Sequence, residues 1–183
     1  MSIEPRIVVT GRTADGSSIF IKDEPTEAVT MAALPGTEFH LLWGTGNGVA
    51  EVGTGTADPT FQPFFPGPGG TRFLFIRFAP GSGGGEGREP GPTPDEIFAE
   101  ANAKLPGLVE MIEPESEGMH TTDSVDYGIC LEGELCLELD DGREVRLTPG
   151  STIVQRGTRH AWKNRSDKPA LMCYVLVGAE RTS

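Results

Sequence analysis

The sequence predicts an all-β protein with one or two short helices. Short apolar segments alternate with clusters of glycine, proline and aspartate, a pattern typical of strands joined by turns. The chain has 183 residues, of which 37% are hydrophobic and 23% charged, enough to build one compact core. No segment repeats along the chain. These observations favour a single domain over residues 1–183.

Residues 1–80 are expected to supply the N-terminal strands. Residues 6–10 and 17–21 flank an Asp-Gly turn signal and predict an antiparallel pair. Residues 38–43 and 71–78 are apolar and aromatic enough to form two further strands. The glycine- and proline-rich stretch between them is expected to be a long surface loop.

Residues 81–117 are expected to form a flexible loop and a helix. The loop, at 80–92, is rich in glycine and proline and has little to bury. Thr93 is placed as the helix N-cap, with Pro94 at the first helical position. This segment either covers a binding site or packs outside the sheets. The predicted apolar face of the helix consists of Ile97, Phe98, Ala101 and Leu105.

Residues 118–178 are expected to form the core that carries function. A hairpin over residues 135–147 turns at an Asp-Gly pair, the signal of a type I′ turn. It brings together His120 and His160, two of the three histidines in the chain. The apolar run 170–177 suits an interior strand.

Strand alternation after His120 predicts two different faces. One face is polar or small and is expected to line a cavity, whereas the other is wholly apolar. An apolar stripe of this kind is unusual on a monomer, so N-terminal strands or a second subunit must cover it, and we expect a homodimer. By the same parity, His160, Trp162 and Asn164 point together. The polar face holds His120, Thr122, Ser124, Asp126, Gly128 and Cys130, and the apolar face Val125, Tyr127, Ile129 and Leu131.

Two motifs in this core resemble the signature motifs of the cupin superfamily. The resemblance implies a cupin-type double-sheet jelly-roll barrel with an N-terminal strand extension, which holds a metal or a small molecule in its mouth. The first motif is represented by Gly118, His120, Thr122, Asp126 and Gly133, and the second by Gly150, Gly157, His160 and Asn164.

Both motifs depart from the family pattern. Thr122 stands where a second histidine is usual, Asp126 stands where glutamate is usual, and the second motif is one residue shorter than common. Features outside the motifs, such as Leu-Pro-Gly at 34–36 and Pro-Gly-Gly-Thr-Arg-Phe at 68–73, look like a group of single-domain cupins. Some members of that group are named cupin-domain oxidoreductases of fungal aromatic-polyketide clusters, and many bacterial members have no assigned function.

His120, Asp126 and His160 are the candidate metal ligands. Two histidines and one carboxylate match the facial triad that holds Fe(II), and they also suit Mn, Ni or Zn. Asp126 is one methylene shorter than glutamate, so its carboxylate could fall short of an ion between the histidines. The alternative is a metal-free cupin in which Asp126 and Thr122 hydrogen-bond one another or His120.

Further residues are assigned by their place in the motifs. His120 and His160 are the candidate catalytic residues, and Thr122, Gln155 and Trp162 are the candidate substrate-binding residues. Gln155 either presents its amide to a ligand or closes a turn. His40 is expected to be a surface or a satisfied interior histidine. Four arginines could grip an anionic substrate, although solvated arginines are commoner at strand ends: Arg72, Arg77, Arg156 and Arg159.

Charge and cysteine usage narrow the range of partners. With 15 basic and 27 acidic residues the net charge is −12, which argues against nucleic acid and anionic membranes as partners. No apolar run is long enough to span a bilayer, so a cytoplasmic location is expected. The three cysteines lie in apolar segments without metal-site spacing, and we expect buried thiols.

Three functions remain open from the sequence. The first is a metal-dependent oxidoreductase or dioxygenase-like enzyme acting on a small organic substrate, aromatic or polyketide-like. The second is a metal-free dehydratase, isomerase or cyclase that uses histidine as acid or base. The third is a non-catalytic domain that binds a small molecule.

Overall fold

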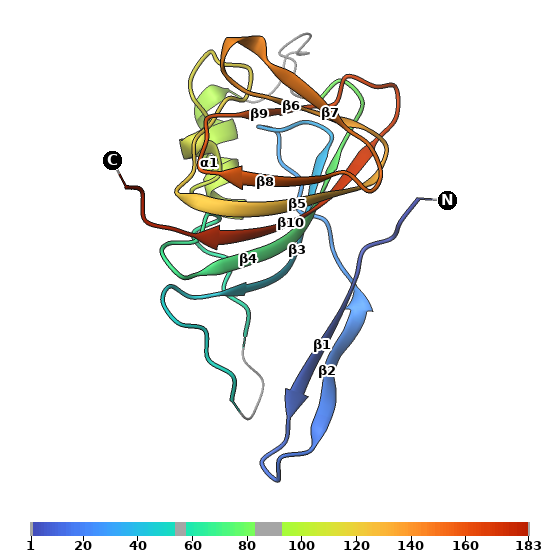
Figure 1. The fold of residues 1–183 in the computed structure, drawn as a ribbon, viewed down its shortest axis with the longest axis vertical. Coiled ribbons are helices and arrows are strands. Elements are labelled where there is room, and N and C mark those ends of the chain that lie inside the picture. The colour runs from blue at the N-terminus through green and yellow to red at the C-terminus, as the bar shows by residue number, and fades with distance from the viewer. Residues whose placement is uncertain (1, 54–57, 83–92, 183) are drawn as a thin grey trace.

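Two antiparallel sheets face one another and form the body of the molecule (Figure 1). The computed structural model describes residues 2–53, 58–82 and 93–182. The all-β, double-sheet fold predicted from the sequence is confirmed. The five-stranded sheet has the order β3 (Thr37–Thr45), β4 (Thr71–Phe78), β10 (Ala170–Gly178), β5 (Ser124–Glu132) and β8 (Thr152–Arg156), and the three-stranded sheet has β7 (Glu144–Leu147), β6 (Leu135–Glu138) and β9 (Ala161–Lys163).

A separate hairpin projects from this body (Figure 1). Its strands, β1 (Arg6–Arg12) and β2 (Ser18–Pro25), pair with one another in an antiparallel sheet of their own. The predicted pair is confirmed, and both strands run further than expected. The side chain of Phe20 on β2 is 76% exposed.

Strand β10 is the central strand of the larger sheet. It pairs antiparallel with β4 on one side and with β5 on the other, as an apolar interior strand must. Tyr174 lies opposite Leu74 on β4 and Gly128 on β5. A Cβ atom at Gly128 would lie 2.9 Å from the Tyr174 ring and 2.7 Å from Ile153. Glycine at 128 therefore leaves the space that the tyrosine ring occupies.

The hairpin of β6 and β7 turns as the sequence predicted. Asp141 and Gly142 have φ angles of 61° and 67°, the positive values that the centre of a type I′ turn requires. The Arg143 amide donates to the Asp140 carbonyl at 3.3 Å across this turn, which includes the short 3-10 segment Asp140–Gly142. The turn folds the chain back so that β6 can pair with β9 as well as with β7.

Helix α1 (Pro94–Lys104) begins at the predicted cap. The Thr93 amide donates to the Glu96 carboxylate at 2.8 Å, and the Glu96 amide donates to the Thr93 hydroxyl at 3.4 Å, so the two residues form a capping box. Phe98 was predicted in the apolar face but is 49% exposed, because a residue adjacent to Ile97 is turned about 100° away on a helix. Ile97, Ala101 and Leu105 are buried, and a 3-10 turn, η1 (Val109–Met111), follows. Most of the predicted loop at 80–92 lies outside the described residues.

The segment before β4 was predicted to be a surface loop, but part of it is buried. Its described residues form no regular element, yet Phe64 is buried in the core. The loop docks on the end of β10, where the Gly178 amide donates to the Gly70 carbonyl at 2.9 Å. A Cβ atom at Gly178 would lie 1.9 Å from the Gly67 carbonyl oxygen, so this approach needs glycine. The docking holds Phe64 and Phe65 beside the inner face of the sheet.

Among the described residues, no helix combines the length and the apolar character needed to cross a lipid bilayer.

Candidate active site

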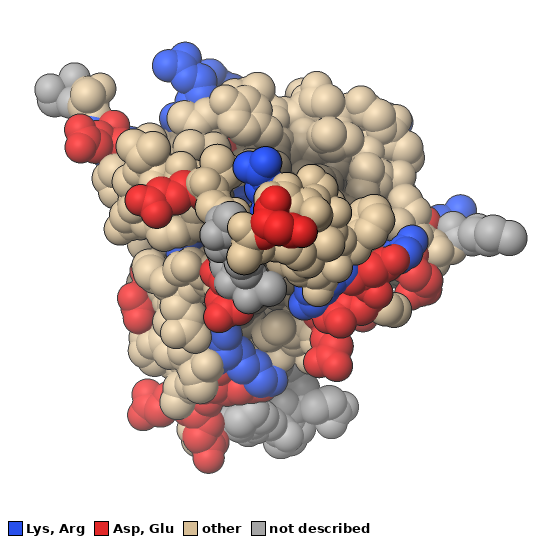
Figure 2. Space-filling view, turned by 90° about the horizontal axis from the view of Figure 1, so that it is seen from below, with Lys and Arg blue, Asp and Glu red and all other residues tan. Residues whose placement is uncertain are grey.

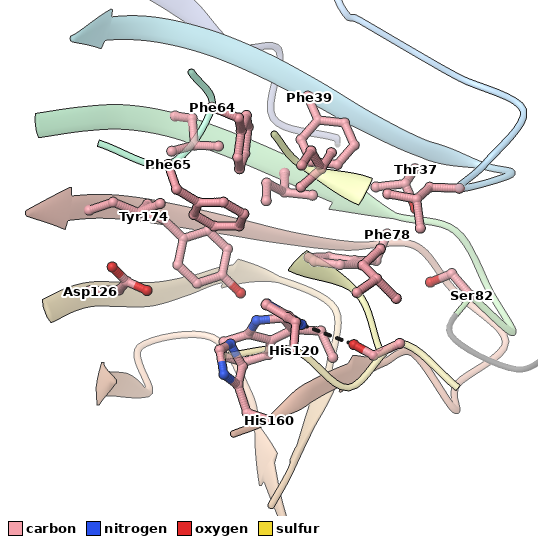
Figure 3. Close-up of a pocket in the computed structure, with 18 residues that line it drawn as sticks. Thr37, Phe39, Phe64, Phe65, Phe78, Ser82, His120, Asp126, His160 and Tyr174 are labelled. Carbon is pink, nitrogen blue, oxygen red and sulfur yellow. Dashed lines mark hydrogen bonds between the residues drawn. The ribbon is translucent and has the colours of Figure 1, made fainter. Parts of the chain in front are cut away.

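The site begins with a backbone bridge between His120 and His160. Each residue donates its amide to the carbonyl of the other at 2.9 Å, which makes them an antiparallel pair. Directly opposed residues of such a pair point to the same side, so both imidazoles enter the same space. The centres of the two rings are 4.2 Å apart (Figure 3).

Each imidazole is also oriented by the backbone two residues earlier. His120 Nδ1 lies 2.9 Å from the Gly118 carbonyl, and His160 Nδ1 lies 2.9 Å from the Thr158 carbonyl. A carbonyl oxygen can only accept a hydrogen bond, so the proton of each neutral ring sits on Nδ1. Both Nε2 atoms are thereby left as hydrogen-bond or proton acceptors.

Burial keeps both rings neutral. Desolvation, aided by the neighbouring His120, lowers the pKa of His160 to about 4, and its hydrogen bond to Thr158 opposes this only in part. Desolvation also lowers the pKa of His120, against opposing effects of the Gly118 carbonyl and Glu113. At neutral pH the site therefore presents two uncharged imidazoles.

The histidines line a cavity of about 140 Å³ between the two sheets (Figure 3). Rings touch one another around it: His160 meets Trp162 edge-on with centroids 5.6 Å apart, and Trp162 meets Tyr174 at 5.4 Å. Apolar protein cavities of about 150 Å³ can hold one benzene ring. The space therefore suits a small, flat molecule. Its aromatic walls are Phe39, Phe64, Phe65, Phe78, Trp162 and Tyr174.

Asp126 and Tyr174 bring two further polar groups to the cavity. Asp126 is buried on β5, and its Oδ1 has no hydrogen-bond partner among the described residues. Burial raises the pKa of Asp126 to about 6, with a smaller opposing effect of Ser124. The Tyr174 hydroxyl also has no partner in the described part of the chain, and burial raises the pKa of this phenol well above its usual value. One acceptor and one donor are thus free to bind a ligand.

The predicted three-ligand metal site does not assemble. Within residues 2–53, 58–82 and 93–182, no three histidine, cysteine, aspartate or glutamate side chains are grouped so that they could hold a metal ion. The structure brings His120 and His160 together, but Asp126 enters from the five-stranded sheet and lies apart from them (Figure 3). The residues present therefore do not fit the triad.

Two candidate substrate-binding residues lie outside the cavity wall. Thr122 is buried and accepts a hydrogen bond from the Ser124 hydroxyl at 2.9 Å. The Gln155 amide donates to the Thr158 carbonyl at 3.1 Å, so it closes the turn that orients His160. Trp162 does line the cavity, and its part in binding stays a prediction.

Two other candidates, Arg72 and His40, hold structure together. Arg72 is buried and donates to backbone carbonyls of Pro63, Thr45 and Thr71. His40 is an interior residue whose Nδ1 lies 2.9 Å from the Thr26 hydroxyl. Neither residue lines the cavity. The three cysteines are free thiols.

Of the six aromatic residues of the wall, sequence reasoning assigned only Trp162 to the cavity. Phe64 and Phe65 come from the irregular loop, and Tyr174 comes from the strand read as uniformly apolar. A signal existed for the first two, since two adjacent phenylalanines in a glycine- and proline-rich stretch need somewhere to be buried. Tyr174 could have been found from alternation, because it shares a strand face with Met172 and Leu176.

Comparisons with known proteins identify the relatives of this chain. The sequence profile of the Cupin_2 family, described as "Cupin domain", matches residues 107–177. Phomopsin biosynthesis cluster protein D of Diaporthe leptostromiformis is 30% identical over 88% of this chain and 71% of its own length. A cupin-domain-containing oxidoreductase of Neurospora crassa is 25% identical over 95% of this chain and 74% of its own. Among solved structures, the Cnp3 cupin domain of Schizosaccharomyces pombe is similar with a TM-score of 0.47 and 8% identity, covering 96% of this chain and 89% of that one.

The raised pKa of Asp126 predicts a pH-dependent effect of Asp126→Asn on stability. The folded protein binds this proton more tightly than the unfolded chain does, so the parent loses stability as pH rises from about 4 through about 6. Asparagine cannot ionise. The free energy of unfolding of the variant, relative to the parent, should therefore rise by up to about 3 kcal/mol from about pH 4 to about pH 7.

Denaturant unfolding at the two pH values measures this difference. Protonation of His160 destabilises parent and variant alike in acid, so it cancels in the comparison. Asp123→Asn is the matched control, because Asp123 lies three residues away and its side chain is 62% exposed. A relative stability of Asp126→Asn that does not change with pH would contradict a desolvated carboxylate.

Proposed function

The chain belongs to the cupin superfamily, and we propose that it is an enzyme that transfers a proton on a small, flat organic molecule held in the aromatic cavity. One observation carries the proposal: two imidazoles lie side by side, and each places its Nδ1 against a backbone carbonyl, which leaves Nε2 as an acceptor. A neutral imidazole with a free Nε2 is a ready general base. Isomerisation, dehydration and cyclisation are the reaction classes that use such a base without a change of oxidation state.

The chemical step takes a proton from a carbon atom beside a carbonyl group. The electron pair of that C–H bond moves into the enolate, and the proton goes to Nε2 of His120 or His160. The Tyr174 hydroxyl, which has no partner among the described residues, donates a hydrogen bond to the oxygen on which charge develops. Return of the proton to another carbon completes an isomerisation, so atoms and electrons balance without a co-reactant.

Burial in the cavity favours the protonation states that this proton transfer needs. The lowered histidine pKa values keep both imidazoles unprotonated at neutral pH but also weaken them as bases. The raised pKa of Tyr174 keeps its hydroxyl a donor. Asp126, with its pKa near neutrality, can hold or release a second proton. The apolar walls strengthen each of these interactions because they exclude water.

A metal-dependent oxidoreductase is the second candidate. Several relatives carry the name cupin-domain-containing oxidoreductase, and hydrogen bonds from Nδ1 to carbonyls are the usual way in which proteins orient histidine ligands. His120 and His160 would be the ligands, and the metal would supply Lewis-acid or redox chemistry. The described residues offer no third ligand beside this pair, so no step is assigned to a metal.

Deuterium exchange on phenylacetone tests the first candidate. This neutral, single-ring ketone has exchangeable C–H bonds beside its carbonyl, and loss of their proton NMR signals in deuterated buffer reports proton abstraction. Chelator-treated protein should catalyse the exchange. Of His120→Gln and His160→Gln, the variant that removes the base should lower the rate about 100-fold, in line with typical general-base contributions.

His40→Gln is the matched control, because His40 is buried but lies outside the cavity, and its variant should exchange as the parent does. Exchange that appears only after Fe(II), Mn, Ni or Zn is restored would favour the metal-dependent candidate. Binding of phenylacetone without exchange would favour a non-catalytic binding domain.

A further inference from the structure

We propose that the cavity selects neutral aromatic molecules bearing hydroxyl groups and excludes carboxylates. This deepens the proposed function, since it names the substrate class of the same cavity, but it is tested by binding alone. Among the described residues that line the cavity there is no lysine and no arginine. An anionic ligand would therefore lose its hydration and gain no counter-charge.

The two buried cations among the described residues, Arg72 and Lys163, are committed elsewhere. Arg72 binds three backbone carbonyls, and Lys163 forms ion pairs with Glu138 at 2.6 Å and Glu117 at 2.9 Å. Arg159, beside His160 in sequence, contacts the carboxylates of Glu113 and Asp140. To bind an anionic ligand, any of these cations would have to break its present hydrogen bonds or ion pairs.

The overall charge of the chain adds no attraction for anions. On the face shown in Figure 2, lysine and arginine side chains lie beside aspartate and glutamate side chains and form no extended basic patch. The whole chain has a net charge of −12. A long-range field of this sign slows the approach of a carboxylate rather than guiding it.

Inside the cavity, Asp126 is the group that discriminates by charge. Its carboxylate is buried among apolar walls and its Oδ1 lacks a partner in the described chain, so a second carboxylate nearby would be repelled strongly. Hydroxyl groups have the opposite effect, because each can donate to Asp126 or to an imidazole Nε2. The Tyr174 hydroxyl can in turn donate to an oxygen of the ligand.

Calorimetric titration with two probes tests the inference at about pH 7.5. Resorcinol carries two hydroxyl groups on one ring, and 3-hydroxybenzoate replaces one of them by a carboxylate. The parent should bind resorcinol at least about tenfold more tightly than 3-hydroxybenzoate, equivalent to about 1.4 kcal/mol. Asp126→Asn should bind 3-hydroxybenzoate at least about tenfold more tightly than the parent does.

Asp123→Asn should keep the parent's preference, because Asp123 is exposed. Thermal unfolding of each variant verifies that it is folded before titration. Equal affinity of the parent for both probes, no binding of resorcinol, or an unchanged preference in Asp126→Asn would overturn the inference. Failure of the proposed function is distinguishable, since it would leave this preference intact while phenylacetone shows no exchange.

A second inference rests on the outside of the larger sheet. Tyr127 on β5 is 52% exposed and lies opposite Val154 on β8, which is 54% exposed. On its other side Tyr127 lies opposite Val175, which in turn lies opposite Phe73. This outer apolar face, made of Tyr127, Val154, Val175 and Phe73, is continuous across four strands.

We infer that the hairpin of β1 and β2 from a second copy of this chain covers the outer apolar face. The hairpin projects from its own body and exposes Phe20, and an isolated two-stranded hairpin is marginally stable in water (Figure 1). Each chain thus has a projecting hairpin with an exposed apolar side chain and an outer apolar face that nothing in the same chain covers among the described residues. Reciprocal exchange of arms satisfies both in one symmetric, closed dimer.

Light scattering after size-exclusion chromatography measures the mass. The parent should be a dimer, and Phe20→Asp and Tyr127→Asp should each shift it to monomer. Val52→Asp is the control, because Val52 is fully exposed in a loop outside both surfaces and should stay dimeric. A monomeric parent, or a dimer that survives Phe20→Asp, would overturn this inference.

Discussion

The two backbone hydrogen bonds between His120 and His160 are the constraint on which the rest of the site depends. Neither histidine lies within a long strand, so this bridge determines that their side chains face the same space. The carbonyls of Gly118 and Thr158 then fix the rotation of each ring and the place of its proton. Because the backbone supplies all four contacts, the arrangement of the imidazoles does not require a metal ion to hold it.

The apolar walls of the cavity shift the pKa values of the polar groups that enter it. Burial lowers the histidine pKa values and raises those of Asp126 and Tyr174, so each group keeps the protonation state in which its role needs it. The same burial makes an uncompensated charge costly. One physical property, the low polarity of the cavity, therefore underlies the proposed base, the proposed donor and the proposed selection of neutral ligands.

Much of the fold could be predicted because its signals are local. The Asp-Gly turns, the cap at Thr93 and the alternation along β5 each depend on a few neighbouring residues, and the pairing of His120 with His160 follows from the hairpin between them. That the predicted metal triad would not assemble could not be foreseen in this way. Whether Asp126 reaches the histidines depends on the separation of two sheets, which no local pattern records. The loop that buries Phe64 is likewise held by contacts with distant residues of β10.

The protonation state of the two histidines tests the central claim most directly. The chain has three histidines, so nitrogen-15 NMR of protein labelled at histidine gives few signals, which His120→Gln and His160→Gln assign. At about pH 7, the account predicts that His120 and His160 are both neutral, with the proton on Nδ1 and a bare Nε2. A charged imidazolium at either position, or a proton on Nε2, would contradict it.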